Sequence, residues 1–149
     1  MFRRVWIVAA LGAAIVATNA CLGSALRVDQ TLPPTFADLA TIKSIEVTTQ
    51  SGDVLLRGSF PEGANSSSKF ERTASLTRPD STTARGTALV EIDRTSGLSE
   101  EKMTVTIDEL PYPESCRLMA DGRELTIFSS VKGKMEFRLA RRVTLASGR

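Results

Sequence analysis

The strongest hairpin signal in the chain lies in residues 116–128, which read Cys-Arg-Leu-Met-Ala-Asp-Gly-Arg-Glu-Leu-Thr-Ile-Phe. Apolar and polar side chains alternate on both sides of Asp121-Gly122, so each half places its apolar residues on one face of a strand. Asp-Gly between two such runs favours a type I′ turn, because both central residues of that turn have positive φ. The segment therefore predicts a β-hairpin.

The same two-residue period extends in both directions from this hairpin, beginning at Ile42. It predicts about eight strands, each with one apolar row that points inward. The rows are Ile45 and Val47; Val54, Leu56 and Phe60; Phe70, Ala74 and Leu76; Ala88, Val90 and Ile92; Met103, Val105 and Ile107; Cys116, Leu118 and Ala120; Leu125 and Ile127; and Met135, Phe137 and Leu139, extended by Val143 and Leu145. Arg72 also falls on an inward row and must either reach out or mark a sheet edge.

Strands that are apolar on one face need a second layer over that face, and the sequence offers no helices to supply it. We therefore predict an all-β fold over residues 42–149, namely an antiparallel β-sandwich of immunoglobulin-like type, with a small barrel as the alternative. Trp6 is the only tryptophan and lies outside this region, so the Cys–Trp–Cys pattern of true immunoglobulin domains is missing. Residues 26–41 contain Pro33-Pro34 and are expected to form a tether with one helical turn.

The first 25 residues predict an export signal or a membrane anchor helix. Arg3 and Arg4 precede an unbroken apolar run at residues 5–17, and small residues follow as far as Ala25. A basic flank, an apolar segment and small residues at the cleavage site are the three parts of a secretory signal. We therefore expect an extracytoplasmic domain.

Three fates of this leader remain open. Cleavage after Ala20 or Ala25 would give a secreted or periplasmic protein. Retention would make residues 5–26 an anchor just long enough to span a bilayer, with the domain outside. Lipid attachment at Cys21 is the third, although Thr18 is unusual at the position three before a lipidated cysteine.

Charge is balanced overall but unevenly distributed along the chain. The net charge of +2 comes from Arg3 and Arg4, so the rest is formally neutral, which argues against a nucleic-acid partner. Residues 100–114 are mainly acidic, and residues 132–149 are mainly basic. We expect these segments to be solvated and to pair with each other; the alternative is a basic patch for anionic lipids or an acidic partner.

Candidate catalytic groups are few. The chain has no histidine, the commonest general base and metal ligand. Ser66 and Lys69, and Ser129 and Lys132, have the Ser-x-x-Lys spacing of some acyl-transfer enzymes, but both pairs fall in predicted loops or at strand ends, where no helical turn brings the two groups together.

The sequence also gives only weak indications of a metal site or of a covalent modification site. A hard cation such as calcium could use acidic residues near the proline-rich loop, although no EF-hand spacing is present; these residues are Glu100, Glu101, Asp108, Glu109 and Glu114. Cys116 is expected to be buried in a strand, and Asn65 begins a glycosylation sequon. We assign no catalytic, cofactor or metal residue.

The sequence thus predicts a non-enzymatic exported domain that binds or supports a component of the cell envelope. A membrane-tethered subunit of a larger envelope assembly and a carboxylate-based hydrolase remain as alternatives. One specific hypothesis is a docking patch of apolar residues on the outward faces of strands. Its members would be Leu55, Leu89, Met119 and Phe128.

Overall fold

The computed structural model of the chain describes residues 26–34, 36, 38–62, 68–95, 97–111 and 113–145. These residues form nine β-strands and one short 3₁₀ helix, η1 (Leu39–Thr41). The strands are β1 (Leu26–Thr31), β2 (Ser44–Thr49), β3 (Val54–Ser59), β4 (Lys69–Thr77), β5 (Ala84–Thr95), β6 (Leu98–Ile107), β7 (Ser115–Ala120), β8 (Arg123–Ser129) and β9 (Met135–Thr144). Strands β2 to β9 confirm the strands that alternation predicted.

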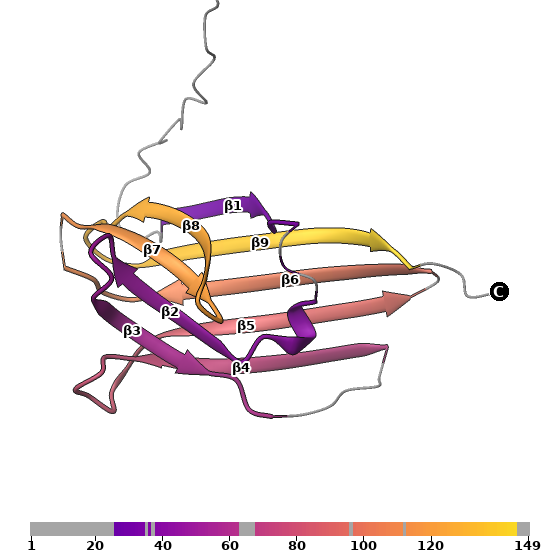
Figure 1. The fold of residues 1–149 in the computed structure, drawn as a ribbon, viewed down its shortest axis with the longest axis horizontal. Coiled ribbons are helices and arrows are strands. Elements are labelled where there is room, and N and C mark those ends of the chain that lie inside the picture. The colour runs from indigo at the N-terminus through magenta and orange to yellow at the C-terminus, as the bar shows by residue number, and fades with distance from the viewer. Residues whose placement is uncertain are drawn as a thin grey trace, which may run out of the picture.

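The nine strands belong to one sheet, in the order β1-β9-β6-β5-β4-β3-β2-β7-β8 (Figure 1). Neighbouring strands are antiparallel, except that β1 runs parallel to β9. The sheet curls into a half-barrel, so its two halves face each other across the core. The all-β class is confirmed. The arrangement is one continuous mixed sheet, where we expected an antiparallel sandwich or a small barrel.

The sheet turns between β3 and β4. These strands share a single registered pair, Arg57 with Thr77, so few backbone hydrogen bonds hold them in one plane. Gly58 lies at this junction, where a Cβ atom would come within 2.6 Å of the Ser75 carbonyl oxygen. Glycine therefore allows the two backbones to approach more closely than any side chain would permit.

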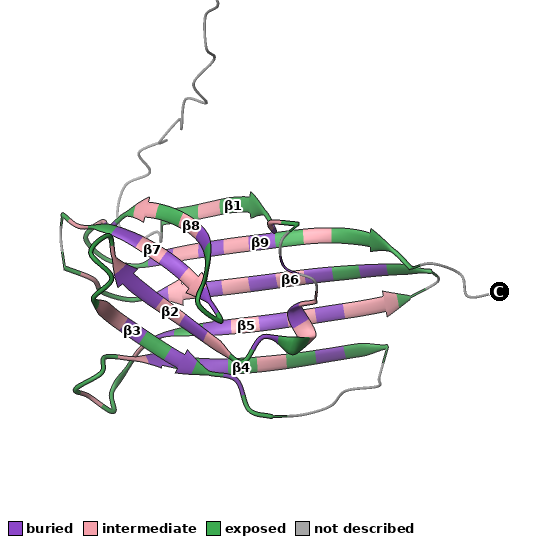
Figure 2. Ribbon diagram, in the orientation of Figure 1, coloured by how far each residue is buried: buried purple, intermediate pink, exposed green. Residues whose placement is uncertain are grey.

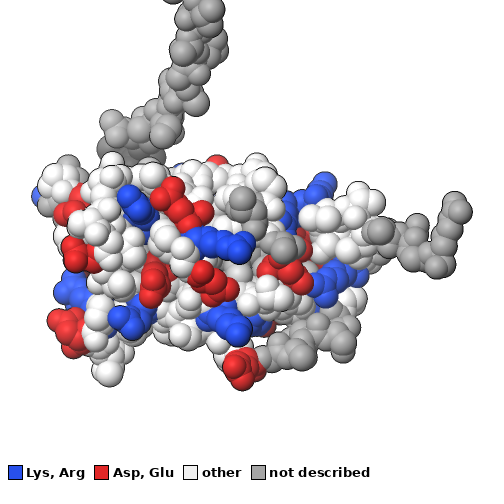
Figure 3. All heavy atoms as spheres, viewed as in Figure 1, with Lys and Arg blue, Asp and Glu red and all other residues white. Residues whose placement is uncertain are grey.

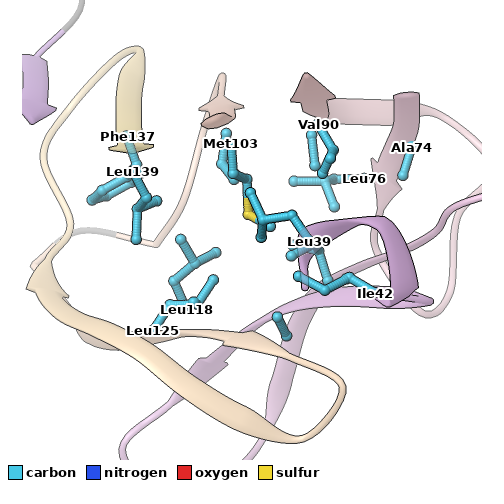
Figure 4. Packing of buried hydrophobic residues seen from close by; sticks show 14 of the residues in the cluster. Leu39, Ile42, Ala74, Leu76, Val90, Met103, Leu118, Leu125, Phe137 and Leu139 are labelled. Carbon is cyan, nitrogen blue, oxygen red and sulfur yellow. The ribbon is translucent and has the colours of Figure 1, made fainter. Parts of the chain in front are cut away.

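The core fills the space between the two halves of the sheet. The predicted inward rows at residues 45–47, 88–92, 103–107, 116–120 and 135–139 are all buried. Figure 2 shows this as alternating buried and exposed bands along the strands, and Figure 4 shows side chains from the two halves meeting in the middle. The prediction of strands with one apolar face is confirmed for these segments.

Residues 26–41 differ from the expected tether. Residues 26–31 form β1 on the edge of β9, from the pair Leu26–Met135 to the pair Thr31–Ala140. Leu32, Phe36 and Leu39 are then buried in the core. The sequence did not reveal this because β1 has an exposed, charged pattern and its partner lies more than a hundred residues away.

Strand β8 departs from the predicted phase of its apolar row. The pairing of β7 with β8 shifts between Leu118 and Met119, which is a β-bulge. A bulge adds one residue to one strand, so side chains beyond it point to the opposite face. The prediction that Ile127 points inward is therefore wrong. Ile127 is 52% exposed, whereas Phe128 packs on Phe137 with ring centroids 4.7 Å apart.

The predicted turn between β7 and β8 is confirmed. Asp121 and Gly122 have φ of 46° and 74°, and they form the two-residue loop that a type I′ turn requires. The Asp121 carboxylate also accepts hydrogen bonds from the backbone of Lys43 (3.0 Å) and Ser44 (2.8 Å). The hairpin thus fixes the start of β2 as well as its own strands.

The leader at residues 1–25 lies outside the described residues, as does the sequon at residues 65–67. Within the described part of the chain, no helix is long and apolar enough to cross a bilayer. At the other end, Val143 and Leu145 continue the row of β9 in phase, but they are 38% and 40% exposed. The prediction that this row stays buried is wrong there.

Candidate functional site

The acidic and basic segments singled out in the sequence lie side by side on β6 and β9. Glu100 pairs with Arg142 at 2.6 Å, and Glu101 pairs with Arg141 at 2.7 Å. Just beyond β6, Asp108 lies 3.6 Å from Lys134. The expectation that these segments pair with each other is confirmed.

Four of the five acidic residues considered for calcium are therefore paired with cations; the exception is Glu114, which forms no ion pair within the described residues. Glu109, the next carboxylate along the chain, lies 3.2 Å from Arg85. Among the described residues there is no group of three or more side chains that could hold a metal ion. Lysines and arginines are interspersed with acidic residues over the face seen in Figure 3, so that face carries no field of one sign.

The two Ser-x-x-Lys matches fall in different places. Ser66 lies outside the described residues, and its lysine, Lys69, pairs with Asp93 on β5 at 2.8 Å. Ser129 is the last residue of β8 and Lys132 lies in the turn after it; both are exposed. Ser129 and Lys132 do not lie on one helical turn, which is what the chemistry would need.

Two ends of the half-barrel can be distinguished by how they are closed. At one end, Phe36 and residues 38–42 lie over the core and contact Arg72, Arg94 and Arg141, and we call this the latched end. Arg72 donates to the Ala40 carbonyl oxygen at 2.5 Å.

Arg94 and Arg141 complete the latch. Arg94 lies 3.3 Å from the Asp38 carboxylate, whose other oxygen accepts the Ala40 N–H at 2.8 Å and caps η1. Arg141 donates to the Phe36 carbonyl oxygen and pairs with Glu101. The guanidinium groups on β4, β5 and β9 thus hold one short segment against the sheet. Arg72, which the sequence placed on an inward row, reaches this segment rather than solvent.

The opposite end carries an open cleft of about 400 Å³, and we call it the cleft end. Three segments line it: residues 54–56 at the start of β3, residues 78–80 after β4, and residues 109–111 after β6. A depression of this volume lies within the range of small-ligand and side-chain binding sites. One wall thus comes from the chain after β6, and the other walls come from β3 and the β4–β5 loop.

The wall at residues 109–111 is held by Ser130, which is 2% exposed. The Ser130 hydroxyl donates to the Pro111 carbonyl oxygen at 2.6 Å and accepts the Glu114 N–H at 2.8 Å. A buried hydroxyl bonded on both sides fixes the loop, because breaking either bond would leave a buried polar group unsatisfied. The cleft wall is therefore a fixed surface.

The cleft combines an apolar floor with a charged rim. Leu55 and Leu110 are half-buried and pack against the core. Arg78 and Asp80 are exposed on the rim, and neither has an ion-pair partner recorded within the described residues. Such a surface can bind an apolar group flanked by polar ones.

Cys116 is buried on β7 as expected, and among the described residues it is a free thiol. Burial raises the pKa of this thiol above its ordinary value, and the charge of Glu114 raises it further. A thiolate is the reactive form, so the structure makes this cysteine unreactive. Its role is that of a small apolar residue in the core.

The four apolar residues proposed for one docking patch are separated in the structure. Leu55 lines the cleft and Phe128 packs on Phe137. Leu89 and Met119 lie on the outward faces of β5 and β7, which belong to different halves of the sheet. Sequence reasoning thus identified Leu55 but missed Leu110 and residues 78–80, which only the sheet topology brings together.

No protein-family model, no curated protein and no solved structure matches the chain.

Proposed function

We propose that this chain is an exported, non-enzymatic β domain that binds a component of the cell envelope through the cleft at its cleft end. The observation that carries the proposal is the cleft itself, with a fixed wall, an apolar floor and a rim of uncommitted charges. Export is supported by the basic, apolar and small-residue order of the first 25 residues. We place the domain outside the cytoplasm on the same basis.

Binding is favoured over catalysis by the chemistry of the cleft residues. Leucine and proline line most of it, and Glu109 is held by Arg85. A carboxylate-based hydrolase needs two carboxylates that converge on one bond, with one free to transfer a proton. The pairing of Glu109 makes the hydrolase the weaker alternative.

A membrane-tethered subunit is the second candidate, and the start of β1 favours it. Leu26 N–H donates to the Lys134 carbonyl oxygen, so the residue that directly follows the predicted leader already belongs to the sheet. Leu26 pairs with Met135, which in turn pairs with Ile107, two residues before the cleft wall. A retained leader would therefore hold the cleft end next to the bilayer.

The experiment places a photo-crosslinking amino acid at Leu110 and, as a matched control, at Leu89. Both leucines are half-buried, but Leu89 lies on the outward face of β5 away from the cleft. We expect an adduct with an envelope component from position 110 and none from position 89 in intact cells. Sequencing the mature N-terminus in each cell fraction tests export and decides between cleavage, lipidation at Cys21 and retention. Equal labelling from both positions, or a cytosolic chain with its leader intact, would refute the proposal.

A further inference from the structure

The β3 wall of the cleft presents backbone as well as side chains. Strand β2 pairs with β3 from Ser44–Ser59 to Thr48–Val54. Strand β4 pairs with it at Arg57–Thr77 alone. Among the described strand pairs, the edge of residues 54–56 that faces β4 therefore has no registered partner. An open strand edge offers N–H and C=O groups to another extended chain.

The chain that leaves β4 does not fill this position itself. Arg78-Pro79-Asp80 follows β4 directly, and proline has no N–H to donate to a ladder. The Ser81 N–H instead donates to the Arg78 carbonyl oxygen at 3.2 Å, which closes a turn. The β4–β5 connection thus turns on itself and leaves the edge of β3 facing the cleft.

The side chains around this edge fit one extended segment. Leu55 and Leu110 provide a floor for an apolar side chain, while Arg78 and Asp80 lie on the rim for polar neighbours. In a strand, alternate side chains point to opposite faces, so one can enter the floor while the next meets the rim. At about 3.4 Å per residue, the open edge accommodates a segment of about three to five residues.

We infer that the cleft binds an extended peptide segment of a partner protein, which adds to the open edge of β3 and inserts one apolar side chain between Leu55 and Leu110. This inference rests on the proposed function and specifies its ligand. Backbone hydrogen bonds supply affinity in such strand addition, and the pocket for the inserted side chain supplies specificity. The partner is thus recognised by an apolar residue within a short extended stretch.

The two outer edges of the sheet are less suited to this role. Strand β1 carries Arg27 and Asp29, which form an ion pair at 3.3 Å on the edge strand. Strand β8 begins with Arg123 and Glu124 and contains the bulge. Charges and bulges on edge strands are devices that prevent strand addition. Residues 54–56 of β3 carry no charged side chain, and the register shift at Leu55 lies in the pairing with β2 rather than on the edge that faces the cleft.

The test uses a phage-displayed library of random nine-residue peptides, selected on the mature chain purified from cells. We expect enrichment of peptides with one apolar residue flanked by polar residues. The best peptide should bind Leu110→Glu at least about tenfold more weakly than the wild type, and Leu89→Glu, the control, with unchanged affinity. N-methylation of the peptide nitrogens that face β3 should weaken binding by about tenfold, whereas methylation at intervening positions should not.

Hydrogen exchange on the wild-type chain provides a readout that needs no variant. The bound peptide should slow exchange of the backbone amides within residues 54–56 and leave those of β8 unchanged. Failure to enrich any peptide, or a bound peptide that neither protects residues 54–56 nor responds to N-methylation, would overturn the inference. The proposed function is tested separately, because an adduct from position 110 in cells would still support a cleft ligand that is not a peptide.

Discussion

The latched end and the cleft end of the half-barrel use charged residues in opposite ways. At the latched end, Arg72, Arg94 and Arg141 each bind a group within residues 36–40. At the cleft end, Arg78 and Asp80 remain on the rim without a recorded partner within the described residues. Charged groups that pair with other groups of the same chain stabilise its fold. Charged groups without such a partner, next to apolar residues, are available to a ligand. The latched end therefore stabilises the fold, and the cleft end is the one available for the proposed recognition.

Substitution of Arg141 is the strongest test of the latched end. Its side chain and that of Glu101 are 13% and 6% exposed, so the substitution Arg141→Met leaves a buried carboxylate without its partner. Loss of one member of a buried ion pair costs about 3–5 kcal/mol. We expect a loss of this size in the free energy of unfolding measured by urea titration.

A neighbouring pair provides the control. Arg142 and Glu100 also form an ion pair, at 2.6 Å, but their side chains are 77% and 54% exposed. Exposed pairs contribute up to about 1 kcal/mol, so Arg142→Met should change stability little. The double variant Glu101→Leu/Arg141→Met should recover part of the loss, because no buried charge remains unpaired. Equal effects from Arg141→Met and Arg142→Met would contradict the latch.

The next largest effect compares one leucine from each end. Leu39 in η1 is fully buried, and Leu39→Ala should lower the free energy of unfolding by about 2–5 kcal/mol. Leu110 on the cleft floor is only half-buried, so Leu110→Ala should cost about 1 kcal/mol or less. Thermal or urea unfolding of the two variants measures both values. A larger cost at Leu110 would mean that the cleft floor serves the core rather than a ligand.

Most of the fold was predictable because it depends on local alternation. The rows on β5, β6, β7 and β9 place every second residue in the core, and a two-residue period is visible without knowing the partner strand. The Asp121-Gly122 turn was predictable for the same reason, since its geometry depends on two adjacent residues.

The remaining features depend on partners distant in the sequence. Strand β1 pairs with β9, and Arg72 donates to the carbonyl oxygen of Ala40, 32 residues earlier in the chain. The cleft joins residues 54–56, 78–80 and 109–111, none of which forms a motif alone. Only the pairing of strands brings these segments together, so composition and period could not predict the candidate site.

At the β-bulge in β8, the prediction from alternation and the structure disagree on which side chain points inward, and this difference can be tested directly. Alternation places Ile127 inward, whereas the structure places Phe128 against Phe137. Phe128→Ala should therefore cost about 2 kcal/mol through lost burial and ring contact. Ile127→Ala should cost about 0.5 kcal/mol or less, as for other exposed positions. A reversed order in urea unfolding would show that β8 pairs without the bulge and would restore the predicted phase.

The smallest effect concerns the outer face of the sheet, where Lys69 on β4 lies beside Asp93 on β5. The hydrogen bond from Lys69 lowers the pKa of Asp93 below its ordinary value of 3.8, and a bond from Thr95 lowers it further. Because the folded-state pKa is depressed, this carboxylate stabilises the fold above about pH 4, and the contribution disappears as the pH falls through the folded-state pKa. Lys69→Met should therefore raise the pKa of Asp93 only partway, since Thr95 still donates.

A carboxyl-carbon NMR titration of Asp93 measures this shift, and Lys102→Met is its control because Lys102 pairs with Glu91 at 2.7 Å instead.

Lys69 has the complementary response. Its pKa is raised from 10.5, chiefly by the same hydrogen bond, so its contribution to stability is present below that pH and is lost as the pH rises through the folded-state value. An Asp93 pKa that does not move in Lys69→Met would mean that this pair is not formed in solution. In that case the charged groups on the outer face would be unpaired, like those on the cleft rim. Ion pairing could then no longer distinguish a surface that binds a partner from one that does not.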